Sequence, residues 1–221
     1  MKTLKNILEN RFSCRKFQNR KIPREILEKV FKMAQRTPSW CNSQAWQVEL
    51  LSGEPLEDFK HGIYDLASKN IKQTPDFIFP ERYDGVYKDR RKVCGVQLYE
   101  SLGIGKDQPE AARKQLLENF KCFDAPHLAM ITSTKLLGVY GAVDCGLYIN
   151  TLMLAAADLG INSIAQAALA SYPAYVREHL HLSDDRMVVC GISMGFEEKD
   201  SPINHYRTDR ADISDVVNWV G

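Results

Sequence analysis

The most apolar stretch of this chain runs from Ala142 to Ile161, and hiding it from water is the first demand on the fold. Three polar side chains interrupt it, namely those of Asp144, Asn150 and Asp158. Because of them, no run reaches the roughly 18 uncharged residues that a membrane-spanning helix needs. We therefore expect a long buried helix over residues 142–159 and no membrane partner.

A second apolar stretch, Met187 to Met194, is short and nearly continuous. Such runs are typical of a strand in a sheet that is covered on both faces. Shorter apolar runs predict further strands over Trp46–Leu51, His127–Thr132 and Ile161–Ala168. Apolar residues at helical spacing predict helices over Met1–Glu9, from Pro23 to Thr37, and over Glu54–Lys69, 91–102, 109–119 and Pro173–His179. The last segment, Ile213 to Val220, fits either a strand or a short helix.

The predicted strands and helices do not alternate strictly along the chain, which favours an α+β fold over a doubly wound parallel sheet. The sequence also lacks the glycine patterns of a Rossmann or P-loop nucleotide site. No repeat, low-complexity tract or Pro/Gly/Ser-rich linker divides it, so we expect one domain over residues 1–221. Residues 70–90 have no clear periodicity and are expected to form an ordered excursion, a candidate lid over a pocket.

Charge and cysteine content narrow the function classes. The net charge is +1, from 29 basic and 28 acidic residues, so nothing global draws the chain to nucleic acid or to an anionic membrane. The six cysteines form no Cys-x-x-Cys pair and stand at no zinc-ligand spacing, so we expect reduced thiols and no metal centre. Met1 to Phe12 shows no secretory pattern. Together these features predict a cytoplasmic location.

The run from Pro38 to Trp46 has the composition of a ligand wall. It joins a predicted helix to a predicted strand and carries two of the three tryptophans, with small hydroxyls and side-chain amides between them. Amides and hydroxyls can hydrogen-bond the polar edge of a flat heterocycle, while apolar rings cover its face. A well-packed helix–strand corner explains the same residues.

Besides the Pro38–Trp46 run, two pairs of arginines are the second and third features that indicate a ligand site. Arg11 and Arg15 flank Ser13 and can converge on one phosphate, because the planar guanidinium donates paired hydrogen bonds. Arg207 and Arg210 form a similar pair near the C-terminus. Taken alone, either segment also suits a solvated charged turn.

The fourth signal is Ala165–Ala170, whose small residues let a backbone approach a ligand closely, or pack a strand end under a helix. Asp144 is most simply a helix-terminal acid favoured by the helix dipole. The five histidines are scattered, and no Ser/His/Asp or Cys/His arrangement is legible. A binding site without an evident side-chain catalyst favours a cofactor that carries the chemistry.

Taken in order, these four segments resemble the FMN-dependent nitroreductase family. The family's N-terminal pattern, Arg-x-Ser-x-Arg-x-Phe, is matched by Arg11, Ser13, Arg15 and Phe17. Its Pro-Ser-x-x-Asn-Ser-Gln-Pro-Trp pattern is matched from Pro38 to Trp46, except that Ala45 replaces the usual proline. The helix Gly141–Gly160 resembles the family's central dimer helix. Gly191–Gly195, with the arginines that follow, resembles its closing phosphate-binding segment. Residues 70–120 match only loosely, so this variable region is the expected lid and substrate region.

The resemblance implies an FMN site at the interface of a homodimer. The residues that it places there are Arg11, Phe12, Ser13, Arg15, Pro38, Ser39, Trp40, Asn42, Asn119, Gln166, Ala167, Ala168, Arg207 and Arg210. Among these, the N-terminal and C-terminal arginines with Ser13 would hold the phosphate and ribityl chain. Segment 166–168 would lie along the isoalloxazine ring, and segment 38–42 would reach the flavin of the partner subunit.

The implied fold is a nitroreductase-like three-layer α/β/α sandwich with a mainly antiparallel central sheet. Its C-terminal segment is exchanged in the homodimer, which would explain Ile213 to Val220.

The implied activity is that of an FMN-dependent oxidoreductase. NADH or NADPH would deliver a hydride to flavin N5, and a nitroaromatic, quinone or similar electron-poor compound would be reduced in a ping-pong cycle. The protein would supply positioning and electrostatics and no catalytic side chain. Three alternatives stay open: a reductive dehalogenase or flavin-processing enzyme on the same fold, a non-enzymatic FMN-binding redox protein, and a structural dimer without a cofactor.

Overall fold

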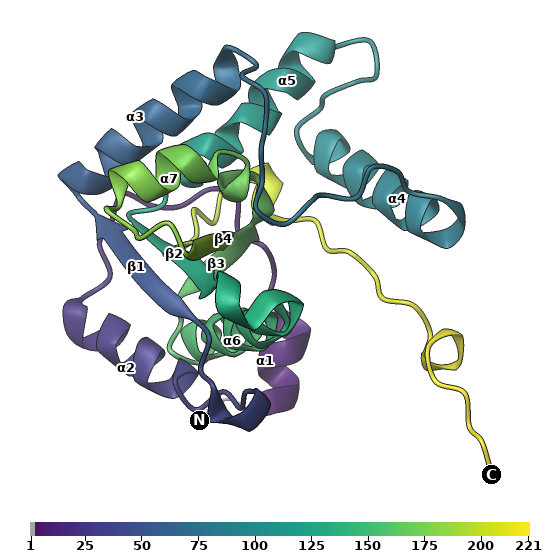
Figure 1. The fold of residues 1–221 in the computed structure, drawn as a ribbon. Helices are drawn as coiled ribbons and strands as arrows, with labels where there is room; N and C mark the ends of the chain where they lie inside the picture. The colour runs from purple at the N-terminus through teal and green to yellow at the C-terminus, as the bar shows by residue number, and fades with distance from the viewer. Residues whose placement is uncertain (1–2) are drawn as a thin grey trace.

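A computed structural model describes residues 3–221 and shows one sheet with helices on both faces (Figure 1). The α-helices are α1 (Leu4–Asn10), α2 (Arg24–Ala34), α3 (Glu54–Ser68), α4 (Gly85–Ser101), α5 (Pro109–Leu117), α6 (Gly138–Asp158) and α7 (Pro173–His179). The strands are β1 (Gln47–Ser52), β2 (His127–Thr134), β3 (Asn162–Gln166) and β4 (Arg186–Gly195). Most predicted elements are confirmed within a few residues of their ends; Met1 and Lys2 of the first predicted helix lie outside the described residues.

The four strands form one antiparallel sheet in the order β1-β2-β4-β3. Apolar side chains alternate along the central strand β2, as they must when both faces of a sheet are covered. Leu128 and Met130 face one core, whereas Ala129 and Ile131 face the other. The mainly antiparallel central sheet is therefore confirmed.

Each face of the sheet carries its own helix layer (Figure 1). On one face, Phe59 and Ile63 of α3 and Val176 of α7 are buried in a shared core. On the other face, Val30 of α2 and Leu152 of α6 are buried in a second core. The predicted α+β class and the three-layer α/β/α sandwich are thus confirmed.

The long helix α6 begins at Gly138, earlier than predicted. The prediction missed the first turn because that turn lies on the surface and lacks periodic burial. Asp144 is therefore buried inside the helix, and its prediction as a helix-terminal acid is wrong. With the turn before it, the helix Lys135–Asp158 is long and apolar enough to cross a membrane by length and composition alone. Its inner face, however, packs on the sheet through Tyr148 and Leu152, as a core helix does.

Three segments differ from their predictions. Strand β3 stops at Gln166, where its pairing with β4 ends, and a short 3-10 helix, η4 (Ala167–Ala170), follows. Helix α4 begins at Gly85, inside the excursion expected over residues 70–90. The C-terminal Ile213–Val220 forms only one 3-10 turn, because no strand lies beside it within residues 3–221 for it to pair with. This C-terminal arm extends away from the sheet (Figure 1).

The first part of the 70–90 excursion is anchored to the sheet layer. The Asp76 carboxylate accepts hydrogen bonds from the Arg177 guanidinium and from the Val188 N–H, both at 2.7 Å. The Thr74 N–H donates to the Ser171 carbonyl at 3.0 Å. A lid in this region would therefore have a fixed base, with α4 as its outer part.

All six cysteines are free, which confirms the expectation of unpaired thiols. Burial raises the pKa of Cys14, Cys122 and Cys190 to about 12 and that of Cys145 to about 11. These four are inert core residues. Cys41 is exposed and Cys94 is half-buried.

Candidate functional site

An N-terminal and a C-terminal segment meet around a pocket of about 350 Å³, which we call the arginine pocket. It is lined by Leu8, Glu9, Arg11, Phe12, Ser13, Arg15, Cys94, Tyr206, Arg207, Thr208 and Arg210. Six of these are predicted site residues: the four arginines, Phe12 and Ser13. The structure therefore brings together two arginine pairs that lie near opposite ends of the sequence.

The arginine pocket is strongly positive. Four arginines line it against a single acid, Glu9, whose carboxylate also lies 3.8 Å from Lys5. The pKa of Arg11 is lowered, first by burial and then by the positive charge of Arg210. Crowded guanidiniums repel one another, and an anion with several oxygens relieves that repulsion while accepting their hydrogen bonds. The pocket is therefore suited to a phosphate group.

Two of the guanidiniums rest on aromatic rings. Arg207 lies 3.8 Å from the centre of the Phe12 ring, and Arg15 lies 5.5 Å from that of Tyr206. The Nη1 of Arg207 also donates to the Asn204 carbonyl at 2.6 Å. Both arginines are thus held in place by the protein itself, which lowers the ordering cost of binding an anion.

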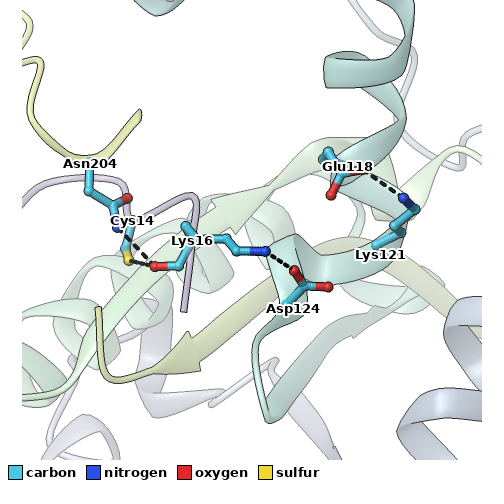
Figure 2. A network of polar contacts seen from close by, with 6 residues as sticks. All are labelled: Cys14, Lys16, Glu118, Lys121, Asp124 and Asn204. Carbon is cyan, nitrogen blue, oxygen red and sulfur yellow. Dashed lines mark hydrogen bonds and ion pairs between the residues drawn. The ribbon is translucent and has the colours of Figure 1, made fainter. Parts of the chain in front are cut away.

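Asn204 fastens the C-terminal segment to the N-terminal one (Figure 2). Its Oδ1 accepts from the Arg15 N–H at 2.8 Å, and its Nδ2 donates to the carbonyls of Lys16 at 2.9 Å and Glu198 at 3.1 Å. Asn204 is only 2% exposed, so its amide relies on these part-buried bonds in place of water. Sequence reasoning did not select Asn204, since two of its partners, the backbone groups of Arg15 and Lys16, lie 189 and 188 positions away.

Phe17, the last residue of the N-terminal motif, belongs to the core and not to the pocket. It is 3% exposed, and a Cβ added to Gly195 would lie 2.9 Å from its Cδ1. A glycine at the end of β4 is therefore needed for this close approach.

Gln166 and Asn119 form a second group of predicted residues. The Gln166 Nε2 donates to the Asn119 carbonyl at 2.8 Å, while the hydroxyl of the fully buried Ser193 donates to the Gln166 Oε1. The Gln166 amide is itself 2% exposed, so its side chain is already committed within the protein. Next in the chain, on η4, Ala167 is exposed and Ala168 is half-buried.

An ion pair joins the Asn119 segment to the arginine segment. Asn119 lies on the 3-10 segment η2 (Glu118–Asp124), whose Asp124 pairs with Lys16 (Figure 2). Within η2, Lys121 pairs with Glu118 at 2.7 Å. The Asp124–Lys16 ion pair therefore links the segment that carries Asn119 to the segment that carries Arg11 and Arg15.

The remaining predicted residues, Pro38, Ser39, Trp40 and Asn42, do not line the arginine pocket in the described chain. They form a turn, with the 3-10 helix η1 (Trp40–Asn42), that packs against α6. The Trp40 ring is 57% exposed, whereas Trp46 is 8% exposed and stacks on Tyr148 at 4.8 Å. Of the two tryptophans in this run, Trp46 is a core residue and Trp40 is exposed at the surface.

A larger pocket, of about 670 Å³, lies between α1, the end of α6 and the start of β3. Arg11 and Phe12 are the predicted site residues that border it. Its Arg20 is stacked on Phe196 at 4.3 Å, and no second predicted arginine converges there. The smaller arginine pocket is therefore the better phosphate site. Within residues 3–221, no three His, Cys, Asp or Glu side chains gather as a metal site requires.

Comparison with known proteins identifies relatives of this chain. The Nitroreductase family model matches residues 8–196. The chain is 32% identical to "Nitroreductase NfnB" of Mycolicibacterium smegmatis over 214 residues, which cover 96% of this chain and 91% of the relative. It is 28% identical to a 4-nitrobenzoate reductase of Pseudomonas putida, with coverage of 97% and 94%.

Solved structures show the same fold. The FMN- and NADPH-dependent nitroreductase NfnB from Sphigopyxis sp. strain HMH superimposes with a TM-score of 0.96 at 28% identity, covering 100% of both chains. The FMN-dependent nitroreductase NfnB from Mycobacterium smegmatis, in complex with NADPH, gives a TM-score of 0.93 at 31% identity, covering 98% of this chain and 97% of that chain.

Proposed function

Because the chain belongs to the Nitroreductase family, we propose that it is an FMN-dependent oxidoreductase that uses NADH or NADPH to reduce nitroaromatic, quinone or similar electron-poor compounds. The observation that carries this proposal is the arginine pocket, because four arginines from opposite ends of the chain converge where a cofactor phosphate would bind. The relatives named above support the choice of FMN, NADPH and a nitroaromatic acceptor.

The residues of the pocket fit a flavin mononucleotide. Burial, and then the positive charge of Arg210, lower the pKa of Arg11, and a phosphate dianion would offset the repulsion between the two guanidiniums. Arg207 and Arg15 are held on aromatic rings and need little rearrangement. We assign the phosphate and ribityl chain to these four arginines with Phe12 and Ser13.

We assign the ring system to the second group. Ala167 and Ala168 would lie along the isoalloxazine with small side chains, and Asn119 would lie near its edge, held by the buried Gln166 amide. When bound, FMN supplies the transfer of a hydride from the nicotinamide and its delivery to the acceptor, in two half-reactions of a ping-pong cycle. The protein's part is to hold the ring, stabilise negative charge at its edge and limit water.

The same proposal includes a homodimer. The outer face of α6 exposes a row of apolar side chains, Val139, Tyr140, Val143 and Leu147. Large exposed apolar surfaces of this kind mark interaction sites. A second copy seated on α6 would also bring its arginine pocket towards the Pro38–Asn42 turn, which has no role in the pocket of its own chain. The free thiols suit a cytoplasmic enzyme.

The decisive experiment is optical. The purified protein should be yellow, or its apoprotein should take up FMN, and anaerobic NADH or NADPH should bleach the bound flavin. Adding 4-nitrobenzoate should restore the absorbance, and initial rates should give the parallel lines of a ping-pong mechanism. A protein that takes up no flavin refutes the proposal. A flavin that stays oxidised with both nicotinamides indicates instead a non-enzymatic FMN-binding protein.

A further inference from the structure

We propose that Asp144 is a positioning residue, which holds the Trp40–Ser43 turn in the geometry needed to form a wall of the active site. The inference rests on the proposed function, because that function gives the turn its task. It concerns a buried carboxylate that lies on α6 outside the arginine pocket.

The Asp144 carboxylate binds the turn at both ends of η1. Its Oδ1 and Oδ2 accept the Trp40 N–H at 3.2 and 3.3 Å, and its Oδ2 accepts the Ser43 hydroxyl at 3.1 Å. One helical turn earlier on α6, Tyr140 meets the Trp40 ring edge-on, with ring centres 4.3 Å apart and planes at 78°. The same face of α6 therefore holds both the backbone and the ring of Trp40.

The burial of the Asp144 carboxylate requires an explanation. The residue is 5% exposed, and no ion pair to a cation involves it within residues 3–221. It also lies well beyond the first turn of α6, where the helix dipole favours acids. Burying a carboxylate without a cation is costly, so its hydrogen bonds to the turn are what keep it there.

The turn also needs an external support. Cys41, Asn42 and Gln44 have φ values of 48°, 56° and 48°, in the left-handed region that ordinary residues avoid. The backbone bonds inside the turn are few: the Asn42 N–H donates to the Ser39 carbonyl at 3.0 Å and the Ser43 N–H to the Trp40 carbonyl at 2.9 Å. The Ser39 hydroxyl also accepts the Gln44 N–H at 2.9 Å. Without Asp144, no hydrogen bond from α6 would hold the Trp40 backbone, and we expect Cys41 and Asn42 to relax.

The result of this anchoring is an outward-facing ring. Trp40 remains 57% exposed although its backbone is tied to a buried carboxylate. A rigid exposed indole suits stacking on a flat aromatic acceptor, whereas a mobile one would lose affinity for it. Asp144 should therefore act mainly on the KM of the acceptor, and less on kcat.

The test uses Asp144→Ala and the milder Ser43→Ala, with Asp158→Asn at the end of the same helix as a control. The first measurement is amide hydrogen exchange over residues 39–44 in the protein without flavin. We expect wild-type protection at Trp40 that falls by about tenfold in Asp144→Ala, as loss of a charge-assisted bond predicts. The second is steady-state reduction of 4-nitrobenzoate, in which the acceptor KM should rise by about tenfold and kcat should change by less than about threefold.

Ser43→Ala, which removes one of the bonds from an exposed residue, should give a smaller change in the same direction. Asp144→Asn keeps one acceptor oxygen and should recover part of the loss. Unchanged exchange and unchanged acceptor KM in both Asp144→Ala and Ser43→Ala would overturn the proposal, as would equal changes in Asp158→Asn. Failure of the proposed function would appear instead as a wild-type protein without flavin or reductase activity, and the exchange measurement would still decide the role of Asp144.

Discussion

The guanidinium of Arg207 lies 3.8 Å from the centre of the Phe12 ring, so a residue near the C-terminus rests on one near the N-terminus. Both residues line the arginine pocket. The phosphate site that we propose therefore exists only after the whole domain has folded, because neither segment can form it alone.

Removing arginines from both sides of the pocket should weaken FMN binding. We expect Arg11→Ala combined with Arg207→Ala to raise the Kd for FMN by at least about a hundredfold, since each charge-assisted hydrogen bond contributes about 1.5–3 kcal/mol. The fold should persist, because neither guanidinium is part of a core cluster. Flavin fluorescence titration of the apoprotein measures the Kd.

The matched control for this prediction is Arg24→Ala. The Arg24 side chain is 90% exposed and pairs with Glu28 on α2, away from the pocket. An FMN affinity that is the same in the double variant and in this control would show that the phosphate assignment is wrong.

Asn204→Ala should destabilise the protein and not merely loosen the site. The change leaves the part-buried Arg15 N–H without its partner and removes one bond from the Lys16 carbonyl, which still accepts the Glu198 N–H. We expect the free energy of unfolding to fall by about 3 kcal/mol, with a loss of FMN affinity beside it. Urea denaturation followed by circular dichroism measures the first effect. Asn19→Ala, at a nearby exposed asparagine, should change the stability by less than about 0.5 kcal/mol.

The fold was largely predictable because buried apolar residues recur in the sequence with the period of their helix or strand. The continuous apolar run of β4 and the alternation in β2 both reflect a sheet covered on two faces. Exposed segments show no such periodicity. The first turn of α6 exposes Val139 and Tyr140, and for this reason its start was misplaced and Asp144 was taken for a terminal acid.

The site was predictable only in part. The arginines and the Trp40 run were proposed as one site from the order of the motifs, since no local rule brings distant segments together. The side chains of Asn204 and Asp144 hydrogen-bond backbone groups that are distant in the sequence. Because any residue has such a backbone group, these bonds leave no pattern in a single sequence. Likewise, no pattern distinguishes the core Trp46 from the exposed Trp40, because both lie in one irregular segment.

His127 should make the protein less stable in mild acid. Its ring is 3% exposed, and its Nε2 accepts the Ile22 N–H at 2.9 Å, which requires the unprotonated nitrogen. Burial, and then the charge of Lys21, lower the pKa of His127 in the folded chain. The unfolded chain therefore binds a proton near the ordinary pKa of 6.5 while the folded chain does not. The contribution of His127 to the free energy of unfolding is fully present above that pH and is lost as the pH falls below it.

The corresponding measurement is urea denaturation between pH 5 and pH 8. His127→Gln retains an acceptor but cannot titrate, so the loss of stability towards pH 5 should become shallower by up to about 1.4 kcal/mol per pH unit. His61→Gln, at an exposed histidine on α3, should leave the slope as in the wild type. A wild-type slope in the His127 variant would assign the acid sensitivity to other groups.

The C-terminal arm should hold the proposed dimer together. Val216, Trp219 and Val220 are 71%, 84% and 96% exposed in a segment that extends away from its own sheet (Figure 1). Apolar side chains placed in this way gain stability by docking elsewhere, and we propose that a second copy of the chain supplies the surface. Deleting residues 212–221 spares all four pocket arginines, so it should shift the protein towards monomer in light scattering at micromolar concentration while the phosphate site remains. Trp219→Ala should weaken the dimer to a smaller extent, and Lys106→Ala, at a loop between α4 and α5, should leave it intact. A truncated chain that stays fully dimeric on dilution would show that the arm is not exchanged between subunits.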